Sequence, residues 1–585
     1  LTTAVVLEAF TFALAITIGV TPDMLPAIVT VCLSKGSQLM AKKNVVVKQL
    51  ASIENFGSMD ILCTDKTGTL TQDHIALVKC IDFLENESEV VLKMGHLSSH
   101  FHTGVENPLD GAINEFKDID VSQYQKIDEI PYDFQRKRSS MVVELSGKRI
   151  LITKGAPEEV LKVCTKYELA GEMGSLKSRY QEIEDKFSSL SAGGFRVLAI
   201  CYKDLPSSQA VSYEKTEEQE MIFLGFLAFL DPPKEGVKQT IEELERLGIE
   251  IKILTGDNDL LTKKICGDIG LPIKNLLTGK EMSAMNDMEL TRRALEANVF
   301  ARVTPEQKER IISILKKQGK VVGYMGDGIN DAPALRAADV GVSVNNAVDI
   351  AKDTADIILM EKSLNTLKDG VLEGRKTFHN TMKYVLMGMS SNFGNMFSMM
   401  GAVTFLPFLP MLPAQILFNN LLYDMSQFAL PSDAVDEDEL LRPAHWDLKF
   451  IRKYMIVFGL ISSIFDFLTF YLLYYVYSLG QHEFQTGWLI ESIATQVFVV
   501  YIIRTKKLPF VQSRPSRALL LSTIAVVAIA WGAQYTILGE WMQLARLRFD
   551  IMLVIASYVL VYLGLVEVAK RIFYYFHFRK KATTR

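Results

Sequence analysis

The apolar residues of the chain are gathered into a few long runs, and a polar stretch with only short apolar runs separates the first from the others. The first run covers roughly residues 9–33, long enough to cross the hydrocarbon core of a bilayer as a helix. Six further runs lie near residues 380–404, 413–431, 454–478, 487–503, 518–538 and 549–573. The pattern therefore predicts about seven transmembrane helices and one large polar block.

Basic residues indicate which ends of these helices face the cytoplasm, where lysine and arginine are enriched. They follow the first run at Lys35, Lys42, Lys43 and Lys48. Later clusters are Arg375/Lys376/Lys383, Arg442/Lys449/Arg452/Lys453, Arg504/Lys506/Lys507/Arg514/Arg517 and Arg571/Arg579/Lys580/Lys581. We therefore expect the polar block to be cytoplasmic, although Arg546 and Arg548 fall on the opposite side.

Composition agrees with a membrane protein that also has a water-exposed part. Of the 585 residues, 49% are hydrophobic and 22% are charged, and the mean hydropathy is +0.16. A chain this apolar with an ordinary content of charge has segregated its polarity along the sequence. The formal net charge of -5 gives no reason to expect a nucleic-acid partner. None of the six cysteines forms a CxxC pair, which predicts reduced or buried thiols.

Within the polar block, three short apolar runs have the character of buried strands. They cover residues 59–64, 251–254 and 321–325, and polar residues follow each of them directly. The side chains at these strand ends include Asp65, Thr255, Asp257, Asp327 and Asp331. In a doubly wound sheet the carboxyl ends of the strands converge on one crevice, so we expect these residues to share a site.

Asp65 is the candidate nucleophile of that site, because an aspartate can attack phosphorus to give an aspartyl-phosphate. Its carboxylate and a γ-phosphate are both anions, so a divalent cation, Mg²⁺, has to neutralise them together. Thr-Gly-Thr at residues 67–69 offers hydroxyls and backbone N–H groups to the phosphoryl group, and Lys308 offers a cation. The competing interpretation is a buried strand that ends in a capped turn, with Lys308 a solvated helix residue.

Residues 76–220 are predicted to form an insertion that carries nucleotide-binding residues of its own. Phe134 offers an aromatic face for stacking, and Lys154 offers a cation beside Gly155, where a ligand can approach the backbone. Arg196 can make a bidentate phosphate contact. Each of these residues alone is weak evidence for nucleotide binding, because a buried phenylalanine or a surface arginine is the commoner explanation. Only a family pattern makes the assignment stronger.

The first predicted transmembrane helix is interrupted in its middle. The segment Thr-Pro-Asp-Met-Leu-Pro at residues 21–26 places Asp23 between two prolines. The helix must unwind there and free backbone carbonyls, which is tolerated in a bilayer where the backbone lines a cavity. A carboxylate inside the membrane is a functional candidate by default, and a kink with Asp23 packed against a neighbouring helix is the alternative.

Later predicted helices carry polar residues as well. These are Asn392, Asn395, Asn420 and Asp424, together with Asp466 and Glu491 in the helices that follow. We expect the first four to line a cation path opposite Asp23. For the asparagines, hydrogen bonds that only hold helices together are an equal alternative. Asp466 and Glu491 are either structural partners or a second polar contact.

Five motifs occur in a fixed order along the chain. They are Asp-Lys-Thr-Gly-Thr at Asp65, Lys-Gly-Ala at Lys154, Asp-Pro-Pro at Asp231, Thr-Gly-Asp at Thr255 and Gly-Asp-Gly-x-Asn-Asp-x-Pro at Gly326. This order resembles the P-type ATPases over essentially the whole chain. The resemblance implies a multi-domain α/β protein with an all-α membrane domain of about seven helices. It also implies a haloacid-dehalogenase-like doubly wound phosphorylation domain with an inserted α+β nucleotide-binding domain.

The resemblance implies a role for each candidate residue. Asp65 would be phosphorylated, and Asp327 would bind Mg²⁺ together with Asp65 and the Thr67 carbonyl. The catalytic set would be completed by Lys308, Thr255, Asp257, Asn330 and Asp331. ATP would be held by Phe134, Lys154, Gly155, Arg196, Thr255 and Gly256.

The implied domain limits follow from the same resemblance. The broken helix and its stalk would cover residues 1–43, the phosphorylation domain residues 44–75 and 221–365, the nucleotide-binding domain residues 76–220, and the C-terminal membrane domain residues 366–585. The sequence contains no Thr-Gly-Glu-Ser, the motif of the actuator domain in this family. We therefore expect that domain to lie outside this chain, and this polypeptide alone to be unable to complete a transport cycle.

The nature of the transported ion is constrained by ligand chemistry. The broken helix offers oxygen ligands suited to Mg²⁺, Ca²⁺, Na⁺ or H⁺, and no thiolate for a heavy metal. Residues 21–26, 420–427 and 462–466 look like the bacterial magnesium-translocating P-type ATPases, which import Mg²⁺ across the inner membrane. We expect ATP, Mg²⁺ and membrane lipid as partners, with the oligomeric state left open. The alternatives are a proton or calcium pump of the same fold and a membrane-anchored phosphatase with the same nucleophile.

Overall fold

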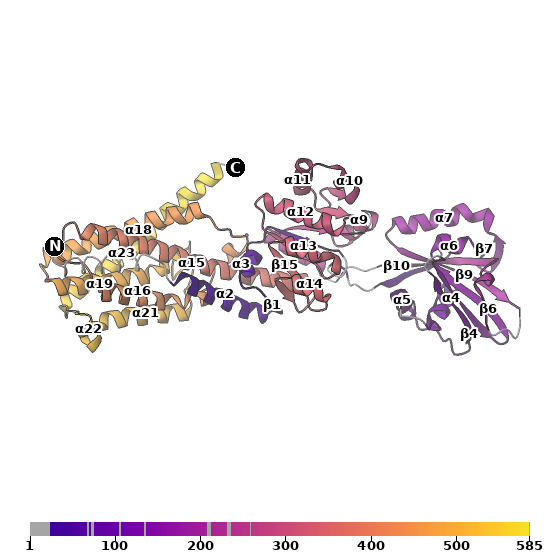
Figure 1. The fold of residues 1–585 in the computed structure, drawn as a ribbon, viewed down its shortest axis with the longest axis horizontal. Coiled ribbons are helices and arrows are strands. Elements are labelled where there is room, and N and C mark those ends of the chain that lie inside the picture. The colour runs from indigo at the N-terminus through magenta and orange to yellow at the C-terminus, as the bar shows by residue number, and fades with distance from the viewer. Residues whose placement is uncertain are drawn as a thin grey trace, which may run out of the picture.

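The computed structural model describes residues 24–66, 70–71, 75–103, 107–133, 136–206, 212–230, 234, 236–257 and 259–583. Figure 1 shows these residues as three bodies in a row: a bundle of helices at one end, a parallel sheet in the middle and a second sheet at the other end. Asp23, Thr67, Phe134 and Asp231, which the sequence singled out, lie outside the described residues.

The middle body is built on an eight-stranded sheet in the order β1, β16, β15, β14, β2, β11, β13, β12. Its strands are β1 (Val45–Val47), β2 (Ile61–Thr64), β11 (Glu250–Leu254), β12 (Leu276–Thr278), β13 (Val299–Ala301), β14 (Val322–Met325), β15 (Val340–Val344) and β16 (Ile357–Leu359). All neighbours are parallel except β1 and β16. The three strands predicted from the sequence are confirmed as β2, β11 and β14, and they are adjacent.

Helices connect the parallel strands, as a doubly wound sheet requires. They are α3 (Ser52–Gly57), α8 (Val237–Arg246), α9 (Asp259–Asp268), α10 (Gly279–Ala284), α11 (Asp287–Glu296), α12 (Pro305–Lys317), the short 3₁₀ helix η2 (Ile329–Asp331), α13 (Ala332–Ala337) and α14 (Asp349–Thr354). Every residue of β2, β14 and β15 is buried. Burial on both faces explains why these strands are continuous apolar runs instead of alternating ones.

The second sheet is mostly antiparallel and is inserted between β2 and β11 of the first. Its strands are β3 (Ala76–Ile81), β4 (Gln125–Asp133), β5 (Arg138–Leu145), β6 (Lys148–Gly155), β7 (Cys164–Leu169), β8 (Glu172–Ser175), β9 (Arg196–Leu205) and β10 (Met221–Leu230). The elements packed with them are α4 (Glu89–His100), α5 (Pro108–Phe116), α6 (Pro157–Leu161), α7 (Leu176–Ala192) and η1 (Lys215–Glu217). This is the inserted α+β unit that the resemblance implied.

The third body contains helices at all six of the later predicted transmembrane runs. It comprises α2 (Leu25–Ala41), α15 (Leu364–Ala402), α16 (Pro413–Gln427), η3 (Leu430–Ser432), α17 (Glu437–Leu440), α18 (Leu448–Tyr471), η4 (Leu472–Val476), α19 (Gln481–Phe498), α20 (Val500–Ile503), α21 (Arg517–Gly532), η5 (Ala533–Tyr535), α22 (Ile537–Trp541) and α23 (Phe549–Thr583). Within the described residues, four helical segments are long and apolar enough to cross a membrane: Leu448–Val476, Gln481–Ile503, Arg517–Tyr535 and Phe549–His577. The chain is therefore an integral membrane protein.

Helix α15 links the bundle to the middle body, and Figure 1 shows it running from one into the other. Its contact with α3 depends on two glycines. A Cβ atom on Gly57 would lie 2.5 Å from the carbonyl carbon of Gly374. Arg375, fully buried beside this contact, donates from Nε to the Gly57 carbonyl at 3.1 Å. Because the close atoms belong to the backbone, the two helices can approach this closely only without side chains at these positions.

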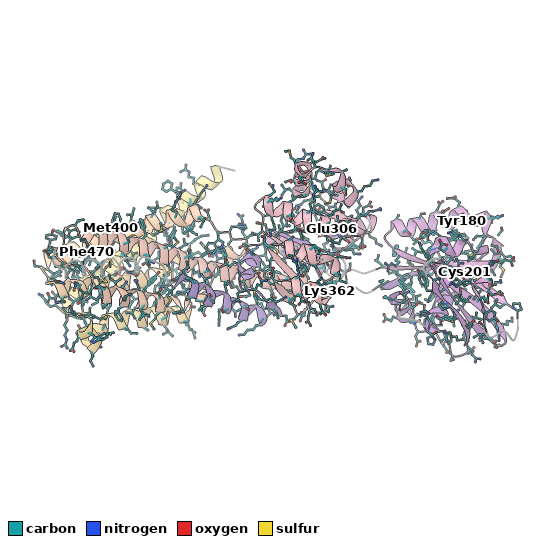
Figure 2. The ribbon with its side chains drawn as sticks, in the orientation of Figure 1. Tyr180, Cys201, Glu306, Lys362, Met400 and Phe470 are labelled. Carbon is teal, nitrogen blue, oxygen red and sulfur yellow. The ribbon has the colours of Figure 1, made fainter. Side chains whose placement is uncertain are left out.

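All six cysteines are free and buried, which confirms the thiol prediction. Cys201 lies inside the second sheet unit, as Figure 2 shows, while Met400 and Phe470 lie in the helical bundle. Burial raises the pKa of Cys266 to about 11 and that of Cys63 to about 12. These thiols are therefore core residues that stay protonated at neutral pH.

Candidate functional site

The candidate site lies at the carboxyl end of β2, in the centre of the parallel sheet. Asp65 follows the last residue of β2, and its backbone N–H donates to the Met325 carbonyl of β14 at 3.2 Å. Thr255 follows β11 on the other side of β2, and its N–H donates to the Phe300 carbonyl at 2.9 Å. Parallel neighbours carry their polar ends to one edge, so residues distant in sequence meet there.

Lys308 lies at the centre of this cluster. It lies in the first turn of α12, whose start is fixed by reciprocal hydrogen bonds between Thr304 and Gln307. Its Nζ is 2.8 Å from Asp65 Oδ2 and 2.9 Å from Asp331 Oδ1, and only 3% of the residue is exposed. The structure therefore brings Lys308 to the predicted nucleophile and excludes the alternative of a solvated helix lysine.

Asp331 organises the loop that follows β14. Its Oδ2 accepts the backbone N–H groups of Asp327 at 3.2 Å and Gly328 at 3.1 Å. Its Oδ1 accepts the Tyr324 hydroxyl at 2.6 Å, and that hydroxyl lies 3.2 Å from Lys308 Nζ. One carboxylate thus fixes the backbone that presents Asp327 and orients the cation that faces Asp65.

The charges of this cluster shift its pKa values. Burial raises the pKa of Asp65, the Lys308 ammonium opposes this shift, and the Asp331 carboxylate adds to it. Burial alone would lower the pKa of Lys308, but the two carboxylates overcome it and raise that pKa above its ordinary value. One lysine therefore does not fully compensate the two acids, and an additional cation would stabilise Asp65 in its ionised, nucleophilic form.

Two further ion pairs flank the nucleophile. The Lys66 ammonium, on a residue that is 5% exposed, pairs with the Asp257 carboxylate. Asp257 also donates its backbone N–H to Thr255 Oγ1 at 3.2 Å. On the other side, Lys362 pairs with the Asp327 carboxylate. Figure 2 shows Lys362 in the middle body. One lysine–aspartate ion pair therefore lies on each side of Asp65.

Three members of the site were not predicted from the sequence. Lys66 lies inside the Asp65 motif, so its position was a usable signal. Tyr324 is part of an apolar strand and has the pattern of a core residue. Lys362 follows β16, a strand that was not predicted. Conversely, Asn330 lies on η2 with its side chain exposed, and in the described structure it makes no hydrogen bond to Asp65 or Lys308.

Lys154 in the second sheet is buried and does not lie exposed at an open nucleotide site. Its Nζ lies 2.9 Å from Ser99 Oγ and pairs with the Asp110 carboxylate. Burial lowers the pKa of Lys154, and the Asp110 charge opposes this shift. Gly155 has a structural reason to lack a side chain, because a Cβ atom there would lie 2.5 Å from the Lys137 carbonyl. Lys137 and Arg138, at the start of β5, fill that space, which differs from the ligand approach expected from the sequence.

Arg196, another nucleotide candidate, lies near the part of the second sheet that contacts the middle body. Arg196 is exposed at the start of β9. The ring of its neighbour Phe195 lies 3.9 Å below Lys264 Nζ of α9, a helix of the middle body. Two arginines that follow Phe134, Arg136 and Arg138, both bind the buried carboxylate of Glu218. The backbone after Phe134 is therefore anchored to the second sheet.

The described polar residues predicted for a cation path lie on two helices of the bundle. Asn392 and Asn395 lie on α15, and Asn420 and Asp424 lie on α16. Asn395 Oδ1 accepts a hydrogen bond from Gln496 Nε2 of α19 at 3.2 Å. This contact favours the interhelical alternative for Asn395, while the path itself remains a prediction because Asp23 lies outside the described residues.

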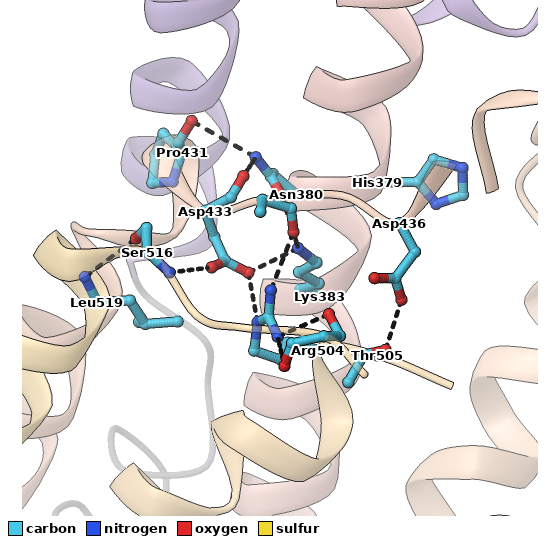
Figure 3. A network of polar contacts seen from close by, with 12 residues as sticks. His379, Asn380, Lys383, Pro431, Asp433, Asp436, Arg504, Thr505, Ser516 and Leu519 are labelled. Atoms are coloured by element: carbon cyan, nitrogen blue, oxygen red, sulfur yellow. Dashed lines mark hydrogen bonds and ion pairs between the residues drawn. The ribbon is translucent and has the colours of Figure 1, made fainter. Parts of the chain in front are cut away.

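A buried polar cluster that the sequence did not predict lies where α15 meets the loops of the bundle, and Figure 3 shows Asp433 at its centre. Asp433 Oδ2 lies 2.8 Å from Lys383 Nζ and 2.7 Å from Arg504 Nε, and Oδ1 accepts the Ser516 N–H at 3.0 Å. Asn380 donates to the Asp433 carbonyl at 3.1 Å. Lys383 and Arg504 are therefore buried partners of one acid, although the sequence suggested cytoplasmic loop charges.

Comparison with known proteins identifies the class to which this fold and site belong. The family model described as P-type ATPase, cytoplasmic domain N, matches residues 64–236, and that of the cation transporting ATPase C-terminus matches residues 408–572. The chain therefore belongs to the P-type ATPases.

Individual relatives show which members of this family the chain resembles. The chain is 45% identical over 574 residues to magnesium-transporting ATPase, P-type 1, of Escherichia coli (strain K12), covering 96% of this chain and 64% of that protein. The same values hold for the protein of that name from Salmonella typhimurium (strain 14028s / SGSC 2262). A calcium-transporting ATPase of Listeria monocytogenes serovar 1/2a is 32% identical over 469 residues, covering 75% of this chain and 53% of that protein. This chain thus spans less than two thirds of the length of these relatives.

Proposed function

We propose that this chain is the catalytic and membrane part of an ATP-driven cation transporter that forms an aspartyl-phosphate on Asp65. The observation that carries the proposal is the position of Lys308, whose ammonium bridges Asp65 and Asp331 at 2.8 Å and 2.9 Å. A buried cation beside a carboxylate at a strand end is suited to a phosphoryl group that arrives between them.

The reaction follows from this geometry. A carboxylate oxygen of Asp65 attacks the γ-phosphorus of ATP, the bond between that phosphorus and the β–γ bridging oxygen breaks, and ADP leaves. Lys308 faces the charge that develops on the transferred phosphoryl group, and Asp331 with Tyr324 holds Lys308 in place. Water later attacks the phosphorus and releases phosphate and free Asp65. The covalent intermediate splits one difficult transfer into two easier steps.

The residues present fit a Mg²⁺ ion. Mg²⁺ in phosphoryl-transfer sites takes one or two carboxylates together with substrate phosphate oxygens. Asp65 and Asp327 supply such carboxylates, and no group of three acids, histidines or cysteines suited to a protein-only metal site occurs in the described part of the chain. Asp65 and Asp327 would hold the ion with the Thr67 carbonyl, and Mg²⁺ supplies neutralisation of the carboxylate and the γ-phosphate when bound.

The second sheet would bind the nucleotide. Arg196 is exposed and offers a cation to the phosphates, and Lys154, paired with Asp110, lies on the neighbouring strand. Phe134, Gly155, Thr255 and Gly256 are the other proposed nucleotide-binding residues. The cation–π contact of Lys264 with Phe195 shows that the Arg196 side of this sheet reaches the middle body. A nucleotide bound there would have its phosphates directed at Asp65.

We propose Mg²⁺ as the transported ion, imported across the bacterial inner membrane, with the sheets on the cytoplasmic side. The similarity to proteins named as magnesium-transporting ATPases supports this choice. Asp23, Asn392, Asn395, Asn420 and Asp424 are the proposed ligands and path residues in the membrane. Ca²⁺ is the alternative, favoured by the more distant similarity to calcium-transporting ATPases.

The nucleophile is tested by phosphorylation of the full-length protein with γ-labelled ATP. Asp65→Asn should abolish acid-stable, hydroxylamine-sensitive labelling and leave nucleotide binding unchanged. Asp349→Asn is the matched control, because the Asp349 side chain is 95% exposed on α14. Undiminished labelling of the Asp65→Asn protein would disprove the assignment.

The ion is tested in proteoliposomes with the catalytic domains facing outward. After ATP is added outside, an indicator in the lumen should report a fall in Mg²⁺, and Asp424→Asn should abolish that fall while preserving the fold. A change in lumenal Ca²⁺ at constant Mg²⁺ would instead support the calcium alternative.

A further inference from the structure

Two carboxyl groups face each other inside the helical bundle, far in sequence from the phosphorylation site. Asp466 lies on α18 and Glu491 on α19, and they are 3% and 1% exposed. Trp488, which lies one turn before Glu491 on α19, donates its indole N–H to Asp466, and this places Glu491 on the helix face beside that carboxylate. A hydrogen bond between two carboxyl groups requires a proton, because an ionised carboxylate can only accept.

The contacts of Asp466 favour its ionised form. Its Oδ1 accepts the indole N–H of Trp488 at 2.9 Å, and its Oδ2 accepts the hydroxyl of Ser398 on α15 at 2.6 Å. The tryptophan nitrogen can only donate, so the Asp466 oxygen that it faces must act as an acceptor. Two groups thus point hydrogen-bond donors at this one carboxylate, which stabilises negative charge on it.

The contacts of Glu491 favour its neutral form. Among the described residues, its Oε2 is buried and has no hydrogen-bond partner. An ionised Glu491 would therefore place a second negative charge beside Asp466 with one oxygen unsolvated, which is a costly arrangement in the membrane interior. A neutral Glu491 avoids this second charge, keeps its proton and can donate a hydrogen bond from its hydroxyl to Asp466.

We propose that Asp466 and Glu491 form a proton-binding site inside the membrane domain, in which Glu491 carries the proton and Asp466 carries the charge. The groups packed around the pair come from α15, α18, α19 and α23. Tyr562 of α23 is close enough for the charges of both acids to act on it, and it supplies no cation. Ser398 and Trp488 are neutral donors, so the proton is the group that prevents two adjacent negative charges.

The site is distinct from the residues assigned to the transported cation. It rests on α18 and α19, whereas Asp424 and Asn420 lie on α16. The shared proton also joins two helices, because it bonds a donor on α19 to an acceptor on α18. A movement that separates these helices would remove the acceptor, so the site holds its proton only while α18 and α19 remain packed.

Infrared spectroscopy of the full-length protein in lipid bilayers at neutral pH tests this proposal, because a protonated carboxyl group has a carbonyl band that a carboxylate lacks. The wild-type protein should show a carboxylic-acid band that shifts to lower frequency in heavy water. Glu491→Gln should abolish that band, since its amide still donates a hydrogen bond to Asp466 but carries no acid proton. Asp466→Asn should retain the band at a shifted frequency, because Glu491 stays protonated.

Asp424→Asn serves as the control for another membrane acid and should leave this band in place. Retention of the band in Glu491→Gln would overturn the assignment, and its loss only in Asp466→Asn would place the proton on the other acid. If the variants do not fold, the wild-type spectrum alone can still contradict the proposal. A wild-type protein without any protonated carboxyl band that responds to heavy water would contradict the proposal.

Discussion

Lys308 Nζ lies 2.8 Å from Asp65 Oδ2, although 243 positions of the sequence separate the two residues. The contact exists because β2 and β14 are parallel neighbours, and α12 leads back into β14 beside the nucleophile. The second sheet is inserted between β2 and β11, yet β2 still pairs with both β11 and β14. The sheet, and not the order of the chain, therefore determines which residues meet.

Lys308→Met should slow phosphorylation of Asp65 by about 100-fold or more, because it removes the one ammonium that bridges Asp65 and Asp331. The rate is measured in a single turnover with saturating labelled ATP. Lys317→Met, at an exposed position of the same helix, is the control and should leave the rate unchanged. An unaltered rate for Lys308→Met would show that the ammonium does not act on the transferred group.

Tyr324→Phe should slow phosphorylation about tenfold while leaving the apparent affinity for ATP unchanged. The substitution deletes only the hydroxyl that donates to Asp331 at 2.6 Å, and a hydrogen bond to a charged group contributes about 1.5–3 kcal/mol. Measuring the rate as a function of ATP concentration separates the two parameters. A weaker affinity with an unchanged maximal rate would contradict a role in positioning Lys308.

The sequence predicted the strand ends of the site because they follow a simple rule. Asp65, Thr255 and Asp327 each come shortly after a short apolar run, and buried parallel strands carry their chemistry at that end. Tyr324 was not predictable in the same way. Its strand is buried on both faces, so an inward tyrosine looks like any core residue until its hydroxyl is seen beside Asp331. Lys362 lies far along the chain from Asp327 and had no local signal.

The helices of the bundle were predictable from hydropathy alone, but their polar contacts were not. Lys383 and Arg504 fell into clusters that the positive-inside rule assigns to loops. Their partner Asp433 lies in the segment after α16, and only packing shows that one acid neutralises both. The same holds for Asn395, whose bond to Gln496 crosses from α15 to α19. Pairings of this kind depend on helix rotation, which the pattern of apolar residues does not determine.

Asp433→Asn should destabilise the bundle by about 3–5 kcal/mol, because it leaves two buried cations without their counter-ion. Burial alone would raise the pKa of Asp433, but Lys383 and Arg504 hold it below its ordinary value. This acid therefore contributes stability at neutral pH that is lost only in strong acid. Thermal unfolding in one detergent gives the comparison.

The control for this variant is Asp438→Asn, since Asp438 is 72% exposed and pairs with Lys507 at the surface. Surface pairs contribute at most about 1 kcal/mol. Equal stability losses for the two variants would argue against a structural role of the buried cluster in Figure 3.

The stability of the second sheet should depend on pH in the acid range because of Glu129. Its Oε2 lies 2.6 Å from Lys126 Nζ and accepts the hydroxyl of Thr103 at 2.7 Å, and its Oε1 lies 2.5 Å from His102 Nδ1. Burial opposes ionisation, but the contacts with Lys126 and Thr103 lower the pKa of Glu129 from 4.5 to about 2. The folded pKa is below the unfolded one, so the stabilisation is complete above pH 4.5 and is lost as the pH falls toward 2.

Glu129→Gln should therefore lower the stability of the region around β4 at pH 6 and abolish its change with pH over this acid range. Hydrogen exchange of peptides from residues 125–133 in the full-length protein, corrected for the intrinsic effect of pH, measures both. Glu184→Gln, at an exposed position of α7, should keep the wild-type profile. If Glu129→Gln exchanged like the wild type at pH 6 and lost protection over the same acid range, the contacts of Glu129 would contribute no net stability.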